Sequence, residues 1–108
     1  MSVRESLSDV LTDEGFYVAT AANGREALDW LGHNPPPCLI LLDLWMPVMG
    51  GEEFRHALLA EAALAPIPVI VISAAGDARS RAEVLRATDF LPKPIDVDRL
   101  LDTVNTYC

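Results

Sequence analysis

The run Cys38-Leu39-Ile40-Leu41-Leu42, followed by Asp43, is the stretch of this sequence that decides its fold class. Five consecutive apolar residues are typical of a strand covered on both faces, because a half-exposed strand would alternate apolar and polar side chains. A second run, residues 69–72, is β-branched throughout and also predicts a buried strand. Strands of this kind indicate a parallel sheet with helices on both faces.

Apolar residues recur at helical spacing before and after these two runs. Gly15 is placed to end the first helix in a left-handed turn, and Asn23 with Glu26 forms a capping-box pattern at the start of the second. Helices are expected near residues 3–14, 23–31, 54–59, 78–86 and 97–104, with further short strands at residues 16–21 and 90–91. Strands separated by helices predict right-handed crossovers.

The length and charge of the chain limit the classes of function that it can have. Its 108 residues, 51% of them hydrophobic, predict a single folded domain spanning residues 1–108. A formal net charge of -8 is a poor match to nucleic acid, because binding a polyanion needs a basic excess. The apolar runs are far shorter than the roughly 20 residues that cross a bilayer, and the first residues do not have the order of a signal peptide. We therefore expect a soluble, cytoplasmic protein that binds neither nucleic acid nor membranes.

The two cysteines, Cys38 and Cys108, do not form a pattern that indicates a function. Cys38 opens an apolar run and is expected to be a small buried hydrophobe, and Cys108 is expected to be a frayed terminal thiol. With two cysteines and two scattered histidines, neither a disulfide nor a metal site is expected.

Three polar residues come at the ends of expected strands: Asp43, Ser73 and Lys93. In open parallel sheets ligands bind beyond the carboxyl ends of the strands, so these side chains are expected to converge at one edge. Each residue also has an ordinary explanation, since Asp and Ser often cap helices or form turns and a Lys beside proline is usually solvated. Together they suit phosphoryl chemistry: a carboxylate can attack phosphorus, Lys can neutralise its oxygens, and Ser can donate a hydrogen bond.

The loop after Asp43, with Met46-Pro47 and Gly50-Gly51, resembles the acceptor loop of response-regulator receiver domains, although Gly50 stands where that family usually has Asp. Ser73 resembles the family's switch hydroxyl thirty residues downstream, and the stretch from Phe90 to Pro94 resembles its aromatic-x-x-Lys-Pro signature. The resemblance covers essentially the whole chain. It implies an α/β, flavodoxin-like three-layer sandwich, here truncated to about four strands and five helices.

The resemblance also implies a function in two-component signal transduction. Asp43 would accept a phosphoryl group from a sensor histidine kinase, and the change would alter contacts with a downstream protein partner. Asp43 and the backbone carbonyl of Trp45 would contribute to an Mg²⁺ site.

The family assigns roles to residues near the phosphoryl group as well. Lys93 would bind that group, Ser73 would move toward it and Phe90 would rotate inward, while Pro94 would follow a cis peptide bond. The readout face would be formed by the helix after Ser73, the last helix and the strand between them.

One departure from the family pattern qualifies these expectations. A full receiver begins with an apolar strand that ends in paired acidic residues, whereas Met1 lies almost at the first turn of the first helix. We expect the strand and the acidic pair to be missing, with Mg²⁺ binding weak or absent. The strand order 2-1-3-4-5 would lose a central member, so the gap either closes or is covered by another chain, which predicts a homodimer.

Two alternatives remain beside the phosphorylated receiver. The first is a phosphorylation-deficient, degenerate receiver that acts only as a protein-interaction or dimerisation module. The second is an enzyme of the aspartate-nucleophile phosphatase type, which needs a second Asp two residues after the first; Trp45 occupies that position, so we expect no enzyme.

Overall fold

The computed structural model of the chain describes residues 3–43, 51–74 and 76–108. Within these ranges, helices and strands alternate, with five helices and three strands in all. Their order is α1 (Val3–Asp13), α2 (Gly24–His33), β1 (Ile40–Asp43), α3 (Gly51–Ala60), β2 (Val69–Ala74), α4 (Ala78–Val84), β3 (Asp89–Lys93) and α5 (Val97–Tyr107).

The three strands form one parallel sheet in the order β1-β2-β3, as the apolar runs predicted. Its central strand, β2, has four consecutive apolar residues that are at most 1% exposed. The edge strand β1 begins at Ile40, two residues later than the apolar run, and only Leu42 in it is fully buried. The sequence therefore predicted the central strand well and overestimated how much of β1 is covered.

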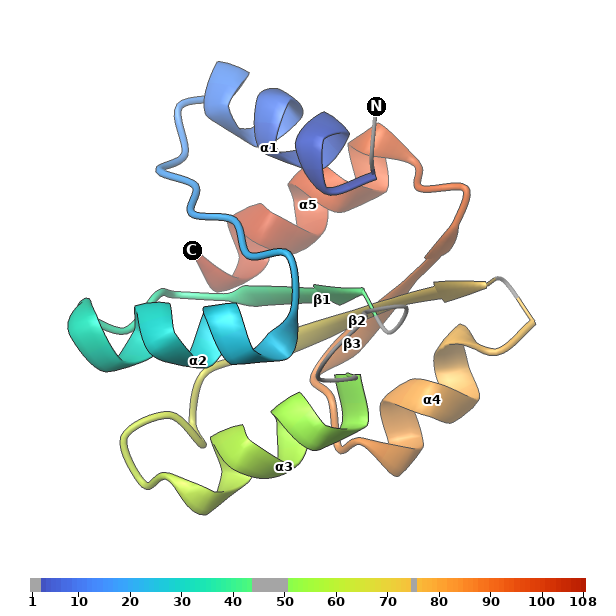
Figure 1. Cartoon of the computed structure of the whole chain (residues 1–108). Helices are drawn as coiled ribbons and strands as arrows, with labels where there is room; N and C mark the ends of the chain where they lie inside the picture. Colours follow the sequence, from blue (N-terminus) through green and yellow to red (C-terminus); the bar gives the residue numbers. More distant parts are fainter. Residues whose placement is uncertain (1–2, 44–50, 75) are drawn as a thin grey trace.

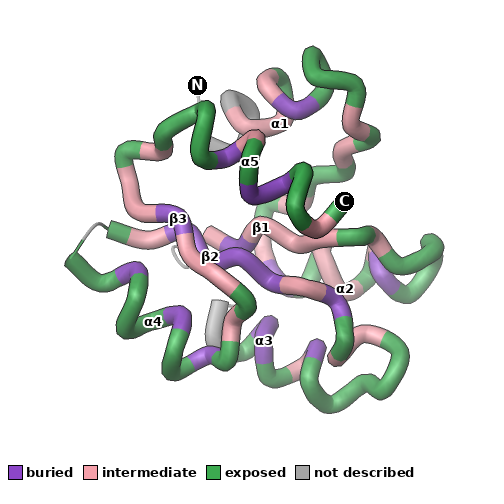
Figure 2. The backbone as a smooth tube through the Cα atoms, turned by 180° about the vertical axis from the view of Figure 1, so that it is seen from behind, coloured by how far each residue is buried: buried purple, intermediate pink, exposed green. Residues whose placement is uncertain are grey.

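Helices cover both faces of the sheet and make three layers (Figure 1). Ile70 and Ile72 of β2 pack in one cluster with residues of α1 and α5. On the opposite face, Val69 packs with α2 and α3, and Val71 packs with α4. Because side chains alternate along a strand, one β2 strand supplies the centre of both cores, and its buried path through the molecule is visible in Figure 2.

Residues 16–21 do not form the strand that the sequence predicted, so the expected count of four strands is wrong for the described residues. The reason is the lack of a hydrogen-bonding neighbour: the described sheet contains no strand beside the free edge of β1. Phe16 and Val18 nevertheless pack against the core beneath α1 and α5, together with Leu39 and Leu41. These partly buried side chains cover part of the core beside β1, but within the described residues no strand pairs with that edge.

The predicted cap at Asn23 and the predicted left-handed turn at Gly15 are confirmed. Asn23 caps α2 by accepting a hydrogen bond from the Glu26 N–H at 2.9 Å. Asp96 caps α5 by accepting bonds from the N–H groups of Asp98 and Arg99. Gly15 follows α1 with a φ of 92°, a conformation that glycine adopts without steric cost.

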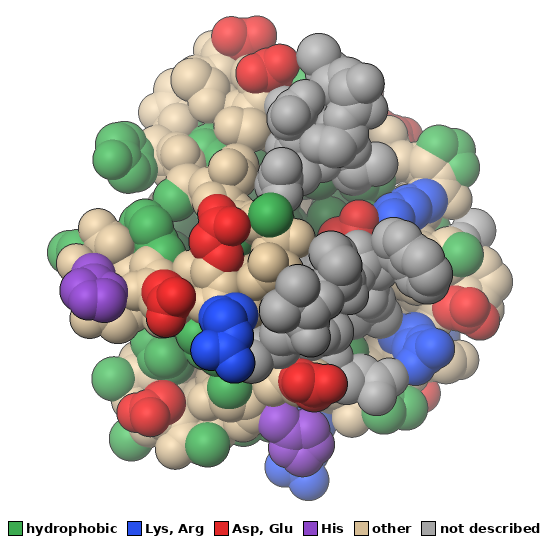
Figure 3. Space-filling model, viewed as in Figure 1, with side chains coloured by type: hydrophobic (Ala, Val, Ile, Leu, Met, Phe, Trp, Pro, Cys, Tyr) green, Lys and Arg blue, Asp and Glu red, His purple; other side chains and the backbone are tan. Residues whose placement is uncertain are grey.

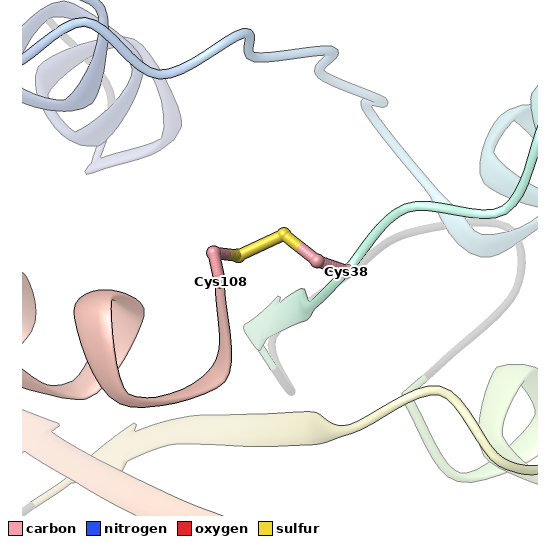
Figure 4. Close-up of a disulfide and its surroundings, with 2 residues drawn as sticks. All are labelled: Cys38 and Cys108. Atoms are coloured by element: carbon pink, nitrogen blue, oxygen red, sulfur yellow. A yellow bond between two sulfur atoms is a disulfide. The ribbon is translucent and has the colours of Figure 1, made fainter.

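The expectation of two unpaired cysteines is wrong. Cys38 and Cys108 form a disulfide with a Cα–Cα distance of 5.5 Å (Figure 4). Cys38 is exposed just before β1, and Cys108 is exposed at the end of α5. The two residues are separated by 70 positions, so only the packing of α5 across the sheet could reveal their proximity.

Loss of the disulfide should destabilise the domain, because the bond closes a long loop and so restricts the unfolded chain. We expect Cys108→Ser to lower the free energy of unfolding by about 2–4 kcal/mol, as measured by urea unfolding. Adding a dithiol reductant should lower the stability of the wild type by a similar amount and leave Cys108→Ser unchanged. Equal stability of the wild type with and without reductant would contradict the prediction.

Candidate functional site

The centre of the site is an ion pair between the ends of two strands that are not neighbours in the sheet. Asp43 is the last residue of β1, and Lys93 is the last residue of β3. The Lys93 Nζ atom donates to both carboxylate oxygens of Asp43, at 3.2 Å to Oδ1 and 3.1 Å to Oδ2. Both side chains are about one-third exposed, at 33% for Lys93 and 32% for Asp43. The pair is therefore held by the sheet yet open to a reactant from solvent.

Ser73 lies at the same edge, on the strand between the two charged residues. The β1–β2 register places Asp43 opposite Ile72, and the β2–β3 register places Ser73 opposite Pro92. Ser73 is thus one residue beyond the partner of Asp43 and one residue short of the partner of Lys93. Each of the three residues lies at or next to the end of its strand, so the parallel pairing places all three at the carboxyl edge of the sheet.

The backbone beyond Lys93 and the side chain of Phe90 have distinctive geometry. The Lys93–Pro94 peptide bond is cis, as the resemblance implied. Two guanidinium groups lie near the half-buried ring of Phe90, with Arg79 of α4 at 5.5 Å and Arg99 of α5 at 5.3 Å from its centroid. Arg99 also donates to the Phe90 carbonyl at 3.2 Å. These arginines were missed because their approach to Phe90 depends on how α4 and α5 pack.

The described residues offer an incomplete set of ligands for Mg²⁺. Asp43 supplies hard carboxylate oxygens, the type of ligand that Mg²⁺ prefers. No cluster of three or more acidic, His or Cys side chains within residues 3–43, 51–74 and 76–108 could hold a metal ion. Trp45, the other expected ligand, falls outside the described residues. This donor set by itself does not fit a protein-built magnesium site.

The surface carries scattered charges. On the face drawn in Figure 3, the described Lys and Arg side chains stand apart from one another among acidic and apolar ones and form no continuous basic surface. The whole chain has 16 acidic and 8 basic residues. As for membranes, none of the helices in the described part of the chain combines the length and the apolar character that a transmembrane span requires.

Comparison with known sequences places this geometry in a family. The response regulator receiver domain matches residues 1–105 of the chain. Response regulator Rre1 of Synechocystis is 38% identical over 101 residues, which is 91% of this chain but 43% of the relative. The chain thus spans less than half the length of this relative.

Solved structures agree on the fold. The chemotaxis response regulator CheY4 of Vibrio cholerae has a TM-score of 0.86 at 31% identity, over 100% of this chain and 91% of that one. The receiver domain of the sensor histidine kinase PA1611 from Pseudomonas aeruginosa, described with a magnesium ion in its active-site cleft, has a TM-score of 0.84 at 23% identity, over 95% of this chain and 85% of that one. Both likenesses bear out the flavodoxin-like receiver fold.

The ion pair at the centre of the site should be measurable but weak. In a double-mutant cycle of Asp43→Asn and Lys93→Met, we expect a coupling free energy of about 0.5–1 kcal/mol, because both groups are partly solvated. Chemical unfolding of the four proteins provides the measurement. The pair Asp29→Asn and Lys93→Met is the matched control and should show no coupling. A cycle on Asp43 and Lys93 that is also additive would mean that the two groups do not interact in solution.

Proposed function

This chain belongs to the response regulator receiver domain family, and on that premise we propose that Asp43 accepts a phosphoryl group from a sensor histidine kinase. The domain is a signal receiver of the two-component type. The observation that carries the proposal is the contact of one ammonium group with both carboxylate oxygens of Asp43. That contact orients the carboxylate at the solvent-facing edge of the sheet and supplies a positive charge where phosphoryl oxygens would arrive.

The transfer is a nucleophilic substitution at phosphorus. One carboxylate oxygen of Asp43 attacks the phosphorus atom, a P–O bond forms, and the P–N bond to the donor histidine breaks. Lys93 then exchanges its contact with the carboxylate for contacts with the phosphoryl oxygens, acting as a point charge. Ser73, on the middle strand of the same edge, donates a hydrogen bond to the new group. Lys93 and Ser73 thereby stabilise the negative charge that develops on the phosphoryl group, and no nucleophile other than Asp43 is required from the protein.

We propose that the signal leaves the site through Phe90. Movement of Ser73 toward the phosphoryl group would open space at the end of β2, and the ring of Phe90, which belongs to the neighbouring strand, would turn into it. That rotation would draw the ring away from Arg79 and Arg99 and alter the surface formed by α4, β3 and α5. A downstream protein partner would read this surface.

We propose that Mg²⁺ binding by this chain is weak or absent, because the described residues offer no group of three or more acidic, His or Cys side chains that could hold the ion. When bound, the ion would neutralise phosphoryl oxygens. The steps assigned to Lys93 and Ser73 do not depend on it.

We propose that the domain is a cytoplasmic binding module rather than an enzyme, and that it binds neither nucleic acid nor membranes. The negative net charge, and the separation of basic side chains on the face drawn in Figure 3, support the exclusion of nucleic acid. The surface contacts of a receiver, rather than turnover of a substrate, would carry its output.

The phosphorylation proposal is tested with acetyl phosphate, a small phosphodonor, in the presence and absence of Mg²⁺, followed by intact-mass measurement. We expect the wild type to gain one phosphoryl group, Asp43→Asn to gain none, and Lys93→Ala to react at least about tenfold more slowly, because it loses the charge that stabilises the transferred group. Asp29→Asn, which removes an exposed carboxylate from α2, is the matched control and should react like the wild type. No mass gain in the wild type would instead support the phosphorylation-deficient interaction module.

We also propose that the chain forms a homodimer. The free edge of β1 in the described sheet leaves backbone groups without a strand partner, and such edges favour association. Light scattering on purified protein should give about twice the monomer mass. A stable monomer at all concentrations tested would refute the dimer and leave the phosphorylation proposal untouched.

A further inference from the structure

The turn between α4 and β3 has a backbone conformation that needs support. Arg86 has a φ of 54°, in the left-handed region that residues with a Cβ atom rarely adopt. Its N–H donates to the Glu83 carbonyl at 3.2 Å, and the Ala87 N–H donates to the Ala82 carbonyl at 2.9 Å. This is the hydrogen-bond pattern of a Schellman turn, in which glycine usually occupies the left-handed position. Because Arg86 is not glycine, contacts elsewhere must help to hold the turn.

A buried arginine from a neighbouring helix supplies such contacts. The Arg55 Nε atom, from α3, donates to the Leu85 carbonyl at 2.9 Å, and its Nη2 atom donates to the Arg86 carbonyl at 2.9 Å. One side chain therefore binds two consecutive carbonyl groups at the C-terminus of α4. A cation placed there also interacts favourably with the helix dipole.

The burial of Arg55 makes this arrangement specific. The residue is only 6% exposed and neighbours the fully buried Phe54 in α3. Its Nη1 atom is buried and has no hydrogen-bond partner among the residues that the structure describes, and burial lowers the pKa of the guanidinium below its ordinary value. An arginine pKa lies so high that the group stays charged at neutral pH. An apolar side chain at position 55 would avoid the cost of desolvating a charged group. Any stabilisation of the fold by Arg55 therefore comes from its hydrogen bonds to the Leu85 and Arg86 carbonyls.

The two ends of α4 are held very differently. At its N-terminus, close to Ser73, Asp77 occupies the cap position but its side chain makes no capping hydrogen bond. At its C-terminus, the Schellman turn and both bonds from Arg55 act together. Helices α3 and α4 lie on the same face of the sheet (Figures 1 and 2), and α3 follows the strand of Asp43 in the chain whereas α4 follows the strand of Ser73.

We infer that Arg55 is a positioning residue that anchors the C-terminal end of α4 to α3, so that the end of α4 next to Ser73 is the end that moves when the site changes state. The anchor itself is a property of the unmodified protein. Its role in the response rests on the proposed function, because it assumes that a phosphoryl group on Asp43 displaces Ser73.

The anchor is tested by amide hydrogen exchange on the unmodified protein. In Arg55→Met we expect the amides of Arg86 and Ala87 to exchange at least tenfold faster than in the wild type, while the amides of β2 keep their protection. Arg55→Lys retains the charge without the planar pair of donors, and we expect it to restore part of the protection. Arg25→Met, which removes an exposed arginine from α2, is the matched control and should change neither region.

Several outcomes would overturn the inference. Unchanged protection of Arg86 and Ala87 in Arg55→Met means that the arginine does not hold the turn. If Arg55→Met also loses protection throughout β2, the comparison of the wild type with Arg55→Lys replaces it. Equal protection of the turn in these two proteins would exclude a role for the paired hydrogen bonds from Arg55 to the Leu85 and Arg86 carbonyls.

A second arm adds acetyl phosphate. In the wild type, we expect altered exchange confined to the first turn of α4, residues 78–81; in Arg55→Met, the change should extend to Ala87. A change in exchange that is spread evenly along α4 in the wild type would overturn the inference that the C-terminal end of α4 stays fixed while the end next to Ser73 moves. If the mass shows no phosphoryl gain, the proposed function fails, whereas the comparison of the unmodified variants still decides whether Arg55 anchors the helix.

Discussion

The parallel hydrogen bonding of β1, β2 and β3 is the constraint on which the rest of this structure depends. It makes all three strands end at the same edge, so Asp43 and Lys93 come into contact although fifty residues separate them, and Ser73 lies at the same edge on the strand between them. The same pairing buries β2 on both sides and supplies the centre of both cores. The strand that stabilises the fold therefore also spaces the charged groups of the site.

The elements around this edge differ in how firmly they are held. Residues 69–72 of the central strand β2 are buried, whereas the ion pair of Asp43 and Lys93 is partly solvated and two exposed arginines lie near the ring of Phe90. Contacts of that kind are individually weak and exchange readily for others. Arg55 contrasts with them, because its side chain is buried and its two hydrogen bonds at the end of α4 are buried or partly buried. The proposed function would use both properties, since a local change at Asp43 would have to move a surface without unfolding the domain.

Much of the fold could be predicted from apolar patterning, and the exceptions have physical causes. Residues 69–72 read as a buried strand because nothing polar interrupts them, and they are buried. Residues 16–21 have the composition of a strand as well, but a strand requires a hydrogen-bonded neighbour, which composition cannot provide. Asp43, Ser73 and Lys93 were recognisable because each is a polar residue at the end of an apolar run. Arg55 gave no such signal, since an arginine among helical residues usually faces solvent.

By itself, the sequence determined the alternation of strands and helices, the central buried strand and the polar residues at the strand ends, because these depend on short-range periodicity and on the topology of parallel sheets. Only the tertiary structure decided which distant groups meet. It joined Cys38 to Cys108, placed Arg79 and Arg99 near the ring of Phe90, and brought Arg55 to the end of α4. Those contacts depend on how whole helices pack across a sheet, and that packing is a property of the assembled core rather than of any segment of the chain.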